Sequence, residues 1–116
     1  MDLDGIRELL RGFVREREWQ QFHTPKNLAM ALAGEAGEVL ELFQWLTPEE
    51  SLAIMSTAKA EAVRDEVADV ATYCIRLADV LGIDLEAAIR AKLVKNAAKY
   101  PVDKVRGKAL KYTELD

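Results

Sequence analysis

The chain has 116 residues, of which 50% are hydrophobic and 7% aromatic, and it carries 16 Lys and Arg against 20 Asp and Glu. This length accommodates one domain over residues 1–116, and the abundance of Ala, Leu and Glu favours an all-α fold. The acidic balance argues against a nucleic acid polymer as partner, and the lack of a long uncharged run or a signal peptide predicts a cytoplasmic protein that does not enter membranes.

Apolar residues at helical spacing, prolines and capping residues divide the sequence into helices. The predicted helices cover residues 4–21, 25–45, 48–80 with a break near 56–60, and 85–99. Their start signals are Thr24-Pro25, the capping box Thr47-Pro48-Glu49-Glu50, and Asp84, and their stop signals include Gly82 and Tyr100-Pro101. The polar tail over residues 102–116 is expected to be irregular. The whole pattern predicts a four- to five-helix bundle.

Two pairs of carboxylates lie on helix faces that otherwise carry apolar residues. In the predicted helix over residues 25–45, Glu35 interrupts an apolar stripe and Glu38 follows one turn later. In the next long helix, Glu66 and Asp69 border a similar stripe. Antiparallel packing of these two helices would bring all four carboxylates together.

Four carboxylates at one place repel one another unless a cation compensates their charge. A ligand set made only of oxygen atoms favours a hard divalent ion such as Mg²⁺, with Mn²⁺ as the alternative. Gly34 and Gly37 flank Glu35, and we expect them to permit close approach by a neighbouring helix or a ligand. The alternative interpretation is that both pairs lie on solvated helix faces, where glutamate is common.

Several segments of the chain resemble one known family. These segments are Trp19-Gln20-Gln21-Phe22-His23-Thr24-Pro25-Lys26-Asn27, Ala33-Gly34-Glu35-Ala36-Gly37-Glu38, Glu41-Leu42-Phe43-Gln44-Trp45, Asp65-Glu66-Val67-Ala68-Asp69-Val70, Lys95-Asn96-Ala97-Ala98-Lys99-Tyr100-Pro101 and Lys111-Tyr112-Thr113. Together they are similar to MazG-type nucleotide pyrophosphohydrolases, and in particular to the dCTP pyrophosphatase-like subgroup. The resemblance extends over nearly the whole chain.

This resemblance implies an all-α enzyme that uses Mg²⁺ to hydrolyse a nucleoside triphosphate to the monophosphate and pyrophosphate. The expected substrate is dCTP or a modified dCTP, in a reaction that cleans the nucleotide pool. The implied metal ligands are Glu35, Glu38, Glu66 and Asp69. Glu38 is the candidate general base, because a carboxylate not fully committed to metal could take a proton from the attacking water.

The resemblance also implies contacts to the substrate. The expected phosphate contacts, on one face of the predicted helix over residues 85–99, are Lys92, Asn96, Lys99 and Tyr100. The expected residues of the base pocket are Trp19, His23, Trp45 and Tyr73. Aromatic residues at helical spacing are also typical of a core, and a lone histidine before a helix cap is typical of a packing residue.

A helical chain of this length has limited capacity to cover all of its apolar faces. We therefore expect a homo-oligomer, and the resemblance implies a tetramer built as a dimer of dimers. Two other functions remain open: a pyrophosphohydrolase of broad dNTP specificity, and a non-catalytic helical module that binds a metal or a partner through its acidic cluster.

Overall fold

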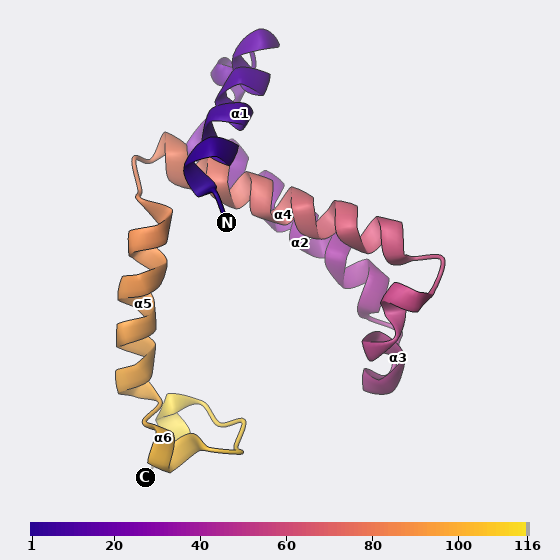
Figure 1. Cartoon of the computed structure of the whole chain (residues 1–116), viewed down its shortest axis with the longest axis vertical. Helices are drawn as coiled ribbons and strands as arrows, with labels where there is room; N and C mark the ends of the chain where they lie inside the picture. Colours follow the sequence, from indigo (N-terminus) through magenta and orange to yellow (C-terminus); the bar gives the residue numbers. More distant parts are fainter. Residues whose placement is uncertain (116) are drawn as a thin grey trace. The chain divides into compact units, whose positions relative to one another are not determined.

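The computed structural model describes residues 1–115, and every regular element in this part of the chain is helical (Figure 1). The α-helices are α1 (Leu3–Glu16), α2 (Pro25–Phe43), α3 (Pro48–Leu52), α4 (Ala60–Val80), α5 (Leu85–Lys99) and α6 (Val102–Val105). Short 3₁₀ turns cover Gln20–Phe22, Ile54–Ser56 and Tyr112–Glu114. The all-α prediction is confirmed, and the helices outnumber the expected four or five because α3 and α6 are separate short elements.

The chain divides into two compact units, Met1–Ile83 and Asp84–Asp116. The first unit contains α1 to α4, and the second contains α5, α6 and the last 3₁₀ turn. A single domain over residues 1–116 stays a prediction. No helix among residues 1–115 combines the length and the apolar character that crossing a bilayer requires.

The first unit is built around α2 and α4, which lie side by side and share the most extensive contact between helices (Figure 1). The predicted apolar stripe of α2 is confirmed as its inner face: Leu28 is only 1% exposed, and the following stripe positions are half-buried. On α4, Val63 is buried as expected, but Val67 is 53% exposed, which corrects its place in the predicted seam. The other seam positions Val70, Cys74 and Leu77 are half-buried, and in the neighbouring row Glu66 and Tyr73 are half-buried as well.

Capping residues set the helix starts as the sequence predicts. The Thr24 hydroxyl accepts a hydrogen bond from the Asn27 amide at 3.2 Å and begins α2. Thr47 and Glu50 form the reciprocal capping box of α3, in which each side chain accepts from the other residue's amide. The break expected near residues 56–60 is present between the 3₁₀ turn at Ile54–Ser56 and α4.

The end of α4 follows the predicted glycine stop. Gly82 has φ +70°, and the amide of the next residue, Ile83, donates to the Ala78 carbonyl at 2.8 Å. This is the Schellman arrangement, which places a residue of left-handed conformation directly after the helix. Glycine adopts that conformation without steric cost.

The end of α1 differs from the prediction of a helix over residues 4–21. The helix ends at Glu16, and Glu18 takes φ +56°, the left-handed conformation that normally selects glycine. The Trp19 amide donates to the Val14 carbonyl at 3.0 Å, so this is a second Schellman end, with glutamate at the glycine position. The periodic pattern continued to residue 21 because nothing at Glu18 signals a helix end.

The second unit is α5 with the C-terminal tail folded against its end. The Tyr112 ring packs edge-to-face on Tyr100, with centroids 6.4 Å apart, and the Lys99 ammonium lies 4.7 Å from the Tyr112 ring centroid. The tail expected to be irregular therefore contains two short helical elements, α6 and the 3₁₀ turn at Tyr112–Glu114. These contacts join two of the segments that carry the family resemblance.

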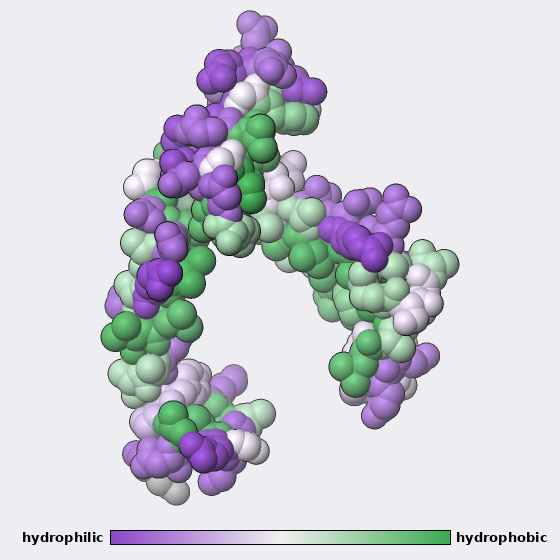
Figure 2. Space-filling view, in the orientation of Figure 1, coloured by the Kyte–Doolittle hydropathy of each residue, from purple (hydrophilic) through white to green (hydrophobic). Residues whose placement is uncertain are grey.

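Large apolar side chains remain exposed on both units. Apolar surface follows α2 and α4 in the first unit and α5 in the second (Figure 2). The exposed residues include Met30, Leu40, Trp45 and Val67 in the first unit, and Ile89, Leu93 and Val94 in the second. A chain that leaves this much apolar surface in water would gain stability by covering it.

The left-handed Glu18 leads to a stability prediction. We expect Glu18→Gly to raise the free energy of unfolding by up to about 1 kcal/mol, because it removes the steric cost of φ +56°. The matched control is Glu16→Gly, two residues earlier in the last turn of α1. This substitution should lower the free energy of unfolding by about 1 kcal/mol. Urea unfolding of the two variants measures both changes. Equal destabilisation by both substitutions would contradict the left-handed assignment.

Candidate metal and nucleotide site

The antiparallel course of α2 and α4 brings together three of the four predicted metal ligands. One carboxylate oxygen each from Glu35, Glu66 and Asp69 can be chosen so that all three lie within 4.8 Å of one another. Glu35 comes from the middle of α2, and Glu66 and Asp69 lie one turn apart on α4. Glu35 and Glu66 are half-buried, whereas Asp69 reaches solvent.

The centre of this cluster lacks compensating charge. The Oε2 atom of Glu66 is buried and has no hydrogen-bond partner among the described residues. The pKa of Glu66 is raised, mainly because its carboxyl group lies where it would share a proton with Glu35. Desolvation raises the pKa further, as do the like charges of Glu35, Asp69 and Asp65. A buried oxygen without a donor is an unfavourable arrangement that a ligand can relieve.

The cluster fits a divalent cation. Opposite ligands of a Mg²⁺ ion lie about 4.2 Å apart, since each stands about 2.1 Å from the ion. Adjacent ligands lie about 3 Å apart, so the three oxygens, which lie within 4.8 Å of one another, would draw closer around a bound ion. All the donors are carboxylate oxygens, which suit a hard ion, and the unpartnered Oε2 of Glu66 would gain a ligand bond.

Glu38 lies outside this cluster. It follows Glu35 by one turn of α2, and its side chain is exposed. A methyl group added to Gly34 or to Gly37 would meet nothing within 4 Å. The expected close approach of a neighbouring helix at these glycines is thus absent from the described part of this chain, and the space beside them is open to a ligand or another subunit.

The predicted aromatic residues of the base pocket occupy different environments. Trp19 follows the end of α1 and packs edge-to-face on Phe13, with ring centroids 5.8 Å apart. Tyr73 is half-buried on α4, one turn beyond Asp69. Trp45 lies just beyond the end of α2 at Phe43 and is 86% exposed.

His23 joins a network of charged side chains that the sequence pattern did not reveal. Its Nδ1 accepts a hydrogen bond from Arg76 Nε at 3.4 Å, and its ring centroid lies 6.5 Å from that of Trp19. Arg76 Nη1 also donates to Asp79 at 3.2 Å, and Arg11 Nε of α1 donates to the same carboxylate at 2.8 Å. The one available signal was an arginine within an apolar stretch of α4, three residues before an aspartate.

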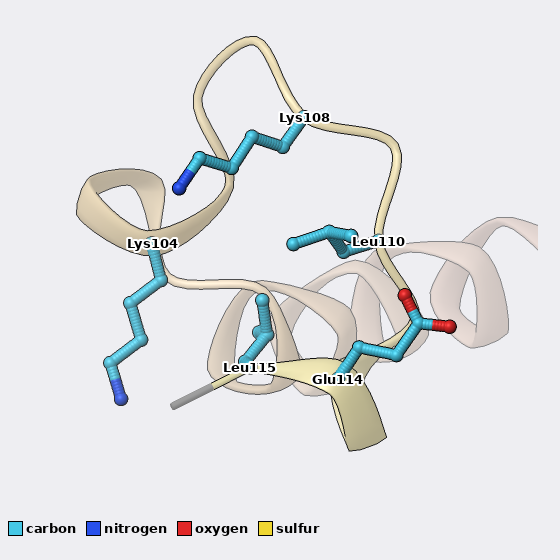
Figure 3. Close-up of a pocket in the computed structure, with 5 residues that line it drawn as sticks. All are labelled: Lys104, Lys108, Leu110, Glu114 and Leu115. Carbon is cyan, nitrogen blue, oxygen red and sulfur yellow. The ribbon is translucent and has the colours of Figure 1, made fainter.

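The predicted phosphate contacts all belong to the second unit. Lys92 and Lys99 are exposed on α5, whereas Asn96 on the same face and Tyr100 just after the helix are half-buried. The contacts of Lys99 and Tyr100 with Tyr112 hold the end of this face together. A pocket of about 210 Å³ in this unit is lined by Lys104, Lys108, Leu110, Glu114 and Leu115, and it includes none of the predicted site residues (Figure 3).

Known proteins resemble this chain over most of its length. The chain matches the MazG-like family over residues 30–115. It is 43% identical to the dCTP pyrophosphatase 1 of Bos taurus and 42% identical to that of Homo sapiens, with alignments that cover 97% of this chain and 68% and 67% of those proteins. The crystal structure of a pyrophosphatase from Archaeoglobus fulgidus superposes with a TM-score of 0.80 at 38% identity, covering 87% of this chain and 94% of that one.

The Asp79 network predicts a pH dependence of stability. The hydrogen bonds from Arg11, followed by the charges of Arg11, Arg76 and Arg7, lower the pKa of Asp79 below its ordinary 3.8. A carboxylate whose pKa is lower in the folded state stabilises the fold above the unfolded value, and this contribution disappears as the pH falls through the folded value. We expect Asp79→Asn to reduce the free energy of unfolding by about 2 kcal/mol at pH 7.

The difference in the free energy of unfolding between the wild type and Asp79→Asn should become smaller below pH 3.8. Denaturant unfolding at several pH values measures it. The control is Glu8→Gln, which removes the other carboxylate that accepts from Arg11 but lies on the surface, so its effect should stay under about 0.5 kcal/mol. An Asp79→Asn effect as large at pH 2 as at pH 7 would contradict the ionic contribution.

Proposed function

Because this chain belongs to the MazG-like family, we propose that it hydrolyses dCTP, or a modified dCTP, to the nucleoside monophosphate and pyrophosphate. The protein is a nucleoside triphosphate pyrophosphohydrolase that cleans the nucleotide pool. The observation that carries this proposal is the carboxylate cluster of Glu35, Glu66 and Asp69, with its buried, unpartnered oxygen. The names of the bovine and human relatives support dCTP as the base-specific substrate.

Mg²⁺ is the proposed cofactor, with Mn²⁺ as a substitute, and the proposed ligands are Glu35, Glu38, Glu66 and Asp69. When bound, the ion supplies positive charge against the triphosphate and makes a water molecule a stronger nucleophile. The exposed Glu38 is the proposed general base, because a carboxylate outside the compact cluster keeps a lone pair for the proton of that water. Its position one turn from Glu35 keeps it within reach of the same ion.

The remaining site residues bind the two ends of the nucleotide. The proposed base contacts are Trp19, His23, Trp45 and Tyr73, and the proposed phosphate contacts are Lys92, Asn96, Lys99 and Tyr100. Aromatic rings stack on bases, and ammonium and amide groups donate to phosphate oxygens. The contact between Trp19 and His23, and the position of Tyr73 one turn beyond Asp69, support a base site beside the carboxylates.

We also propose that the protein is a tetramer built as a dimer of dimers. The exposed apolar residues of α2, α4 and α5 support this, because an assembly would cover them. Trp45 needs neighbours to form a pocket around a base, and its 86% exposure supports completion of that pocket by another subunit. We place the assembly in the cytoplasm, where a protein with one free thiol, Cys74, stays reduced.

The carboxylate cluster gives the direct test of this function. Glu35→Gln and Asp69→Asn should each lower kcat for dCTP by roughly 10²–10³-fold or more, since each removes a ligand of the ion that stabilises the transition state. Both variants should keep the helical fold, and their melting temperatures without metal should rise because carboxylate repulsion falls. The assay incubates protein with each of the four dNTPs and Mg²⁺ and quantifies monophosphate and pyrophosphate.

The matched control is Glu61→Gln, which removes one negative charge from the exposed first turn of α4 outside the cluster. It should retain wild-type turnover. Near wild-type activity of Glu35→Gln in excess Mg²⁺ would contradict the metal site. Similar rates for all four dNTPs would favour the broad-specificity enzyme, and metal binding without any hydrolysis would favour the non-catalytic module.

The proposed assembly predicts complementation between inactive subunits. A mixture of Glu38→Gln and Trp45→Ala subunits should regain part of the activity that each variant lacks, because in the proposed assembly the pocket around Trp45 is completed by another subunit. A mixture of Glu35→Gln and Glu38→Gln should stay inactive, since both changes lie on the same helix. Sedimentation of a fully active 13.0 kDa monomer would contradict the tetramer.

A further inference from the structure

Arg76 is a buried arginine in the second half of α4, and it is only 6% exposed. A buried guanidinium is costly unless acceptors surround its N–H groups. Asp79 accepts from Nη1 at 3.2 Å, and the Nδ1 atom of His23 accepts from Nε at 3.4 Å. Asp79 is itself held by Arg11 of α1, so the guanidinium is fixed in place from two sides.

This contact determines where the imidazole proton of His23 can lie. A guanidinium has N–H donors and no acceptor, and it stays protonated in proteins. Nδ1 of His23 must therefore offer its lone pair to Arg76, which leaves the proton of the neutral ring on Nε2. Burial of the ring, followed by the charge of Arg76, lowers the pKa of His23 and keeps it neutral.

The position of this pair fits the far end of a nucleotide. Arg76 follows Asp69 by seven residues and Tyr73 by three, so all three lie on one face of α4. Seven residues of α-helix extend about 10 Å, which matches the distance from the phosphates of a nucleotide to its base. The centroid of the Trp19 ring lies 6.5 Å from that of His23.

We propose that Arg76 is a positioning residue, which fixes His23 as the Nε2–H tautomer so that the ring donates a hydrogen bond to the base of the nucleotide. This rests on the proposed function and names the group that recognises the substrate. Cytosine carries two acceptors, O2 and N3, beside its amino donor, and a fixed donor selects an acceptor edge. If the ring could change its tautomer, Nε2 would become an acceptor, and the ring would no longer select an acceptor edge of the base.

The first experiment reads the tautomer directly in the metal-free protein. The chain contains one histidine, so the imidazole signals in a long-range ¹H–¹⁵N spectrum need no assignment. In the wild type, Nδ1 should be unprotonated and Nε2 protonated at pH 7, and the pKa from a pH titration should lie below 6.5. A ring that is mostly protonated on Nδ1 in the wild type would overturn the inference without any variant.

The variant Arg76→Met keeps the length of the side chain and removes its donors and charge. It should raise the pKa of His23 and mix the two tautomers, whereas Arg76→Lys, which keeps the charge, should raise the pKa less. The matched control is Arg90→Met, which removes an arginine whose ion pair with Glu86 lies on the exposed surface of α5. The control should leave both the pKa of His23 and its tautomer unchanged. A His23 spectrum that is the same in all variants would overturn the inference.

The second experiment connects the tautomer to catalysis. Arg76→Met should raise KM for dCTP by about tenfold, the effect of one lost hydrogen bond, while kcat changes much less because the carboxylate cluster is intact. An unchanged KM in a variant whose His23 tautomer has changed would overturn the role of Arg76 in recognition. If the wild type hydrolyses no dNTP, the proposed function fails, and the spectrum still decides whether Arg76 fixes His23.

Discussion

The repulsion among Glu35, Glu66 and Asp69, held between two packed helices, is the constraint that organises the first unit. Packing of α2 against α4 leaves Glu35 and Glu66 half-buried beside Asp69, and their like charges oppose the same packing. Burial and like charge raise the pKa of Glu66 and leave one of its oxygens without a donor. A cation bound to the proposed site would offset this cost, because a ligand that binds only the folded state adds to its stability.

A second charged system stabilises the other end of α4, and its chemistry is the reverse. There, two arginines share one aspartate, and Arg76 also donates a hydrogen bond to a neutral histidine. Along α4 the chain therefore carries an anionic cluster at Glu66 and Asp69 and a cationic group at Arg76, which follows Asp69 by about 10 Å along the helix axis. In the proposed function, the phosphates of the nucleotide would lie at the carboxylates and its base near His23.

Exposed apolar surface is the feature of this fold that supports the proposed assembly. Few side chains are fully buried, and Leu28 of α2 is the most deeply buried large residue among the described ones. Val67, which the sequence pattern placed in the seam, is exposed, whereas Val63 of the same row is buried and Val70 is half-buried. Exposed apolar side chains of this kind are suitable for packing against another subunit in the proposed assembly.

Local chemistry alone was enough to predict the helices with strong caps and the two carboxylate pairs. Thr24-Pro25, the Thr47 box and Gly82 act within a few residues, so their effect can be read without knowing what packs nearby. The left-handed Glu18, the exposed Trp45 and the contact between Arg76 and His23 could not be predicted in this way. Each of them follows from how the chain packs, and residues 53 positions apart carry no periodic or capping signal that identifies them as partners.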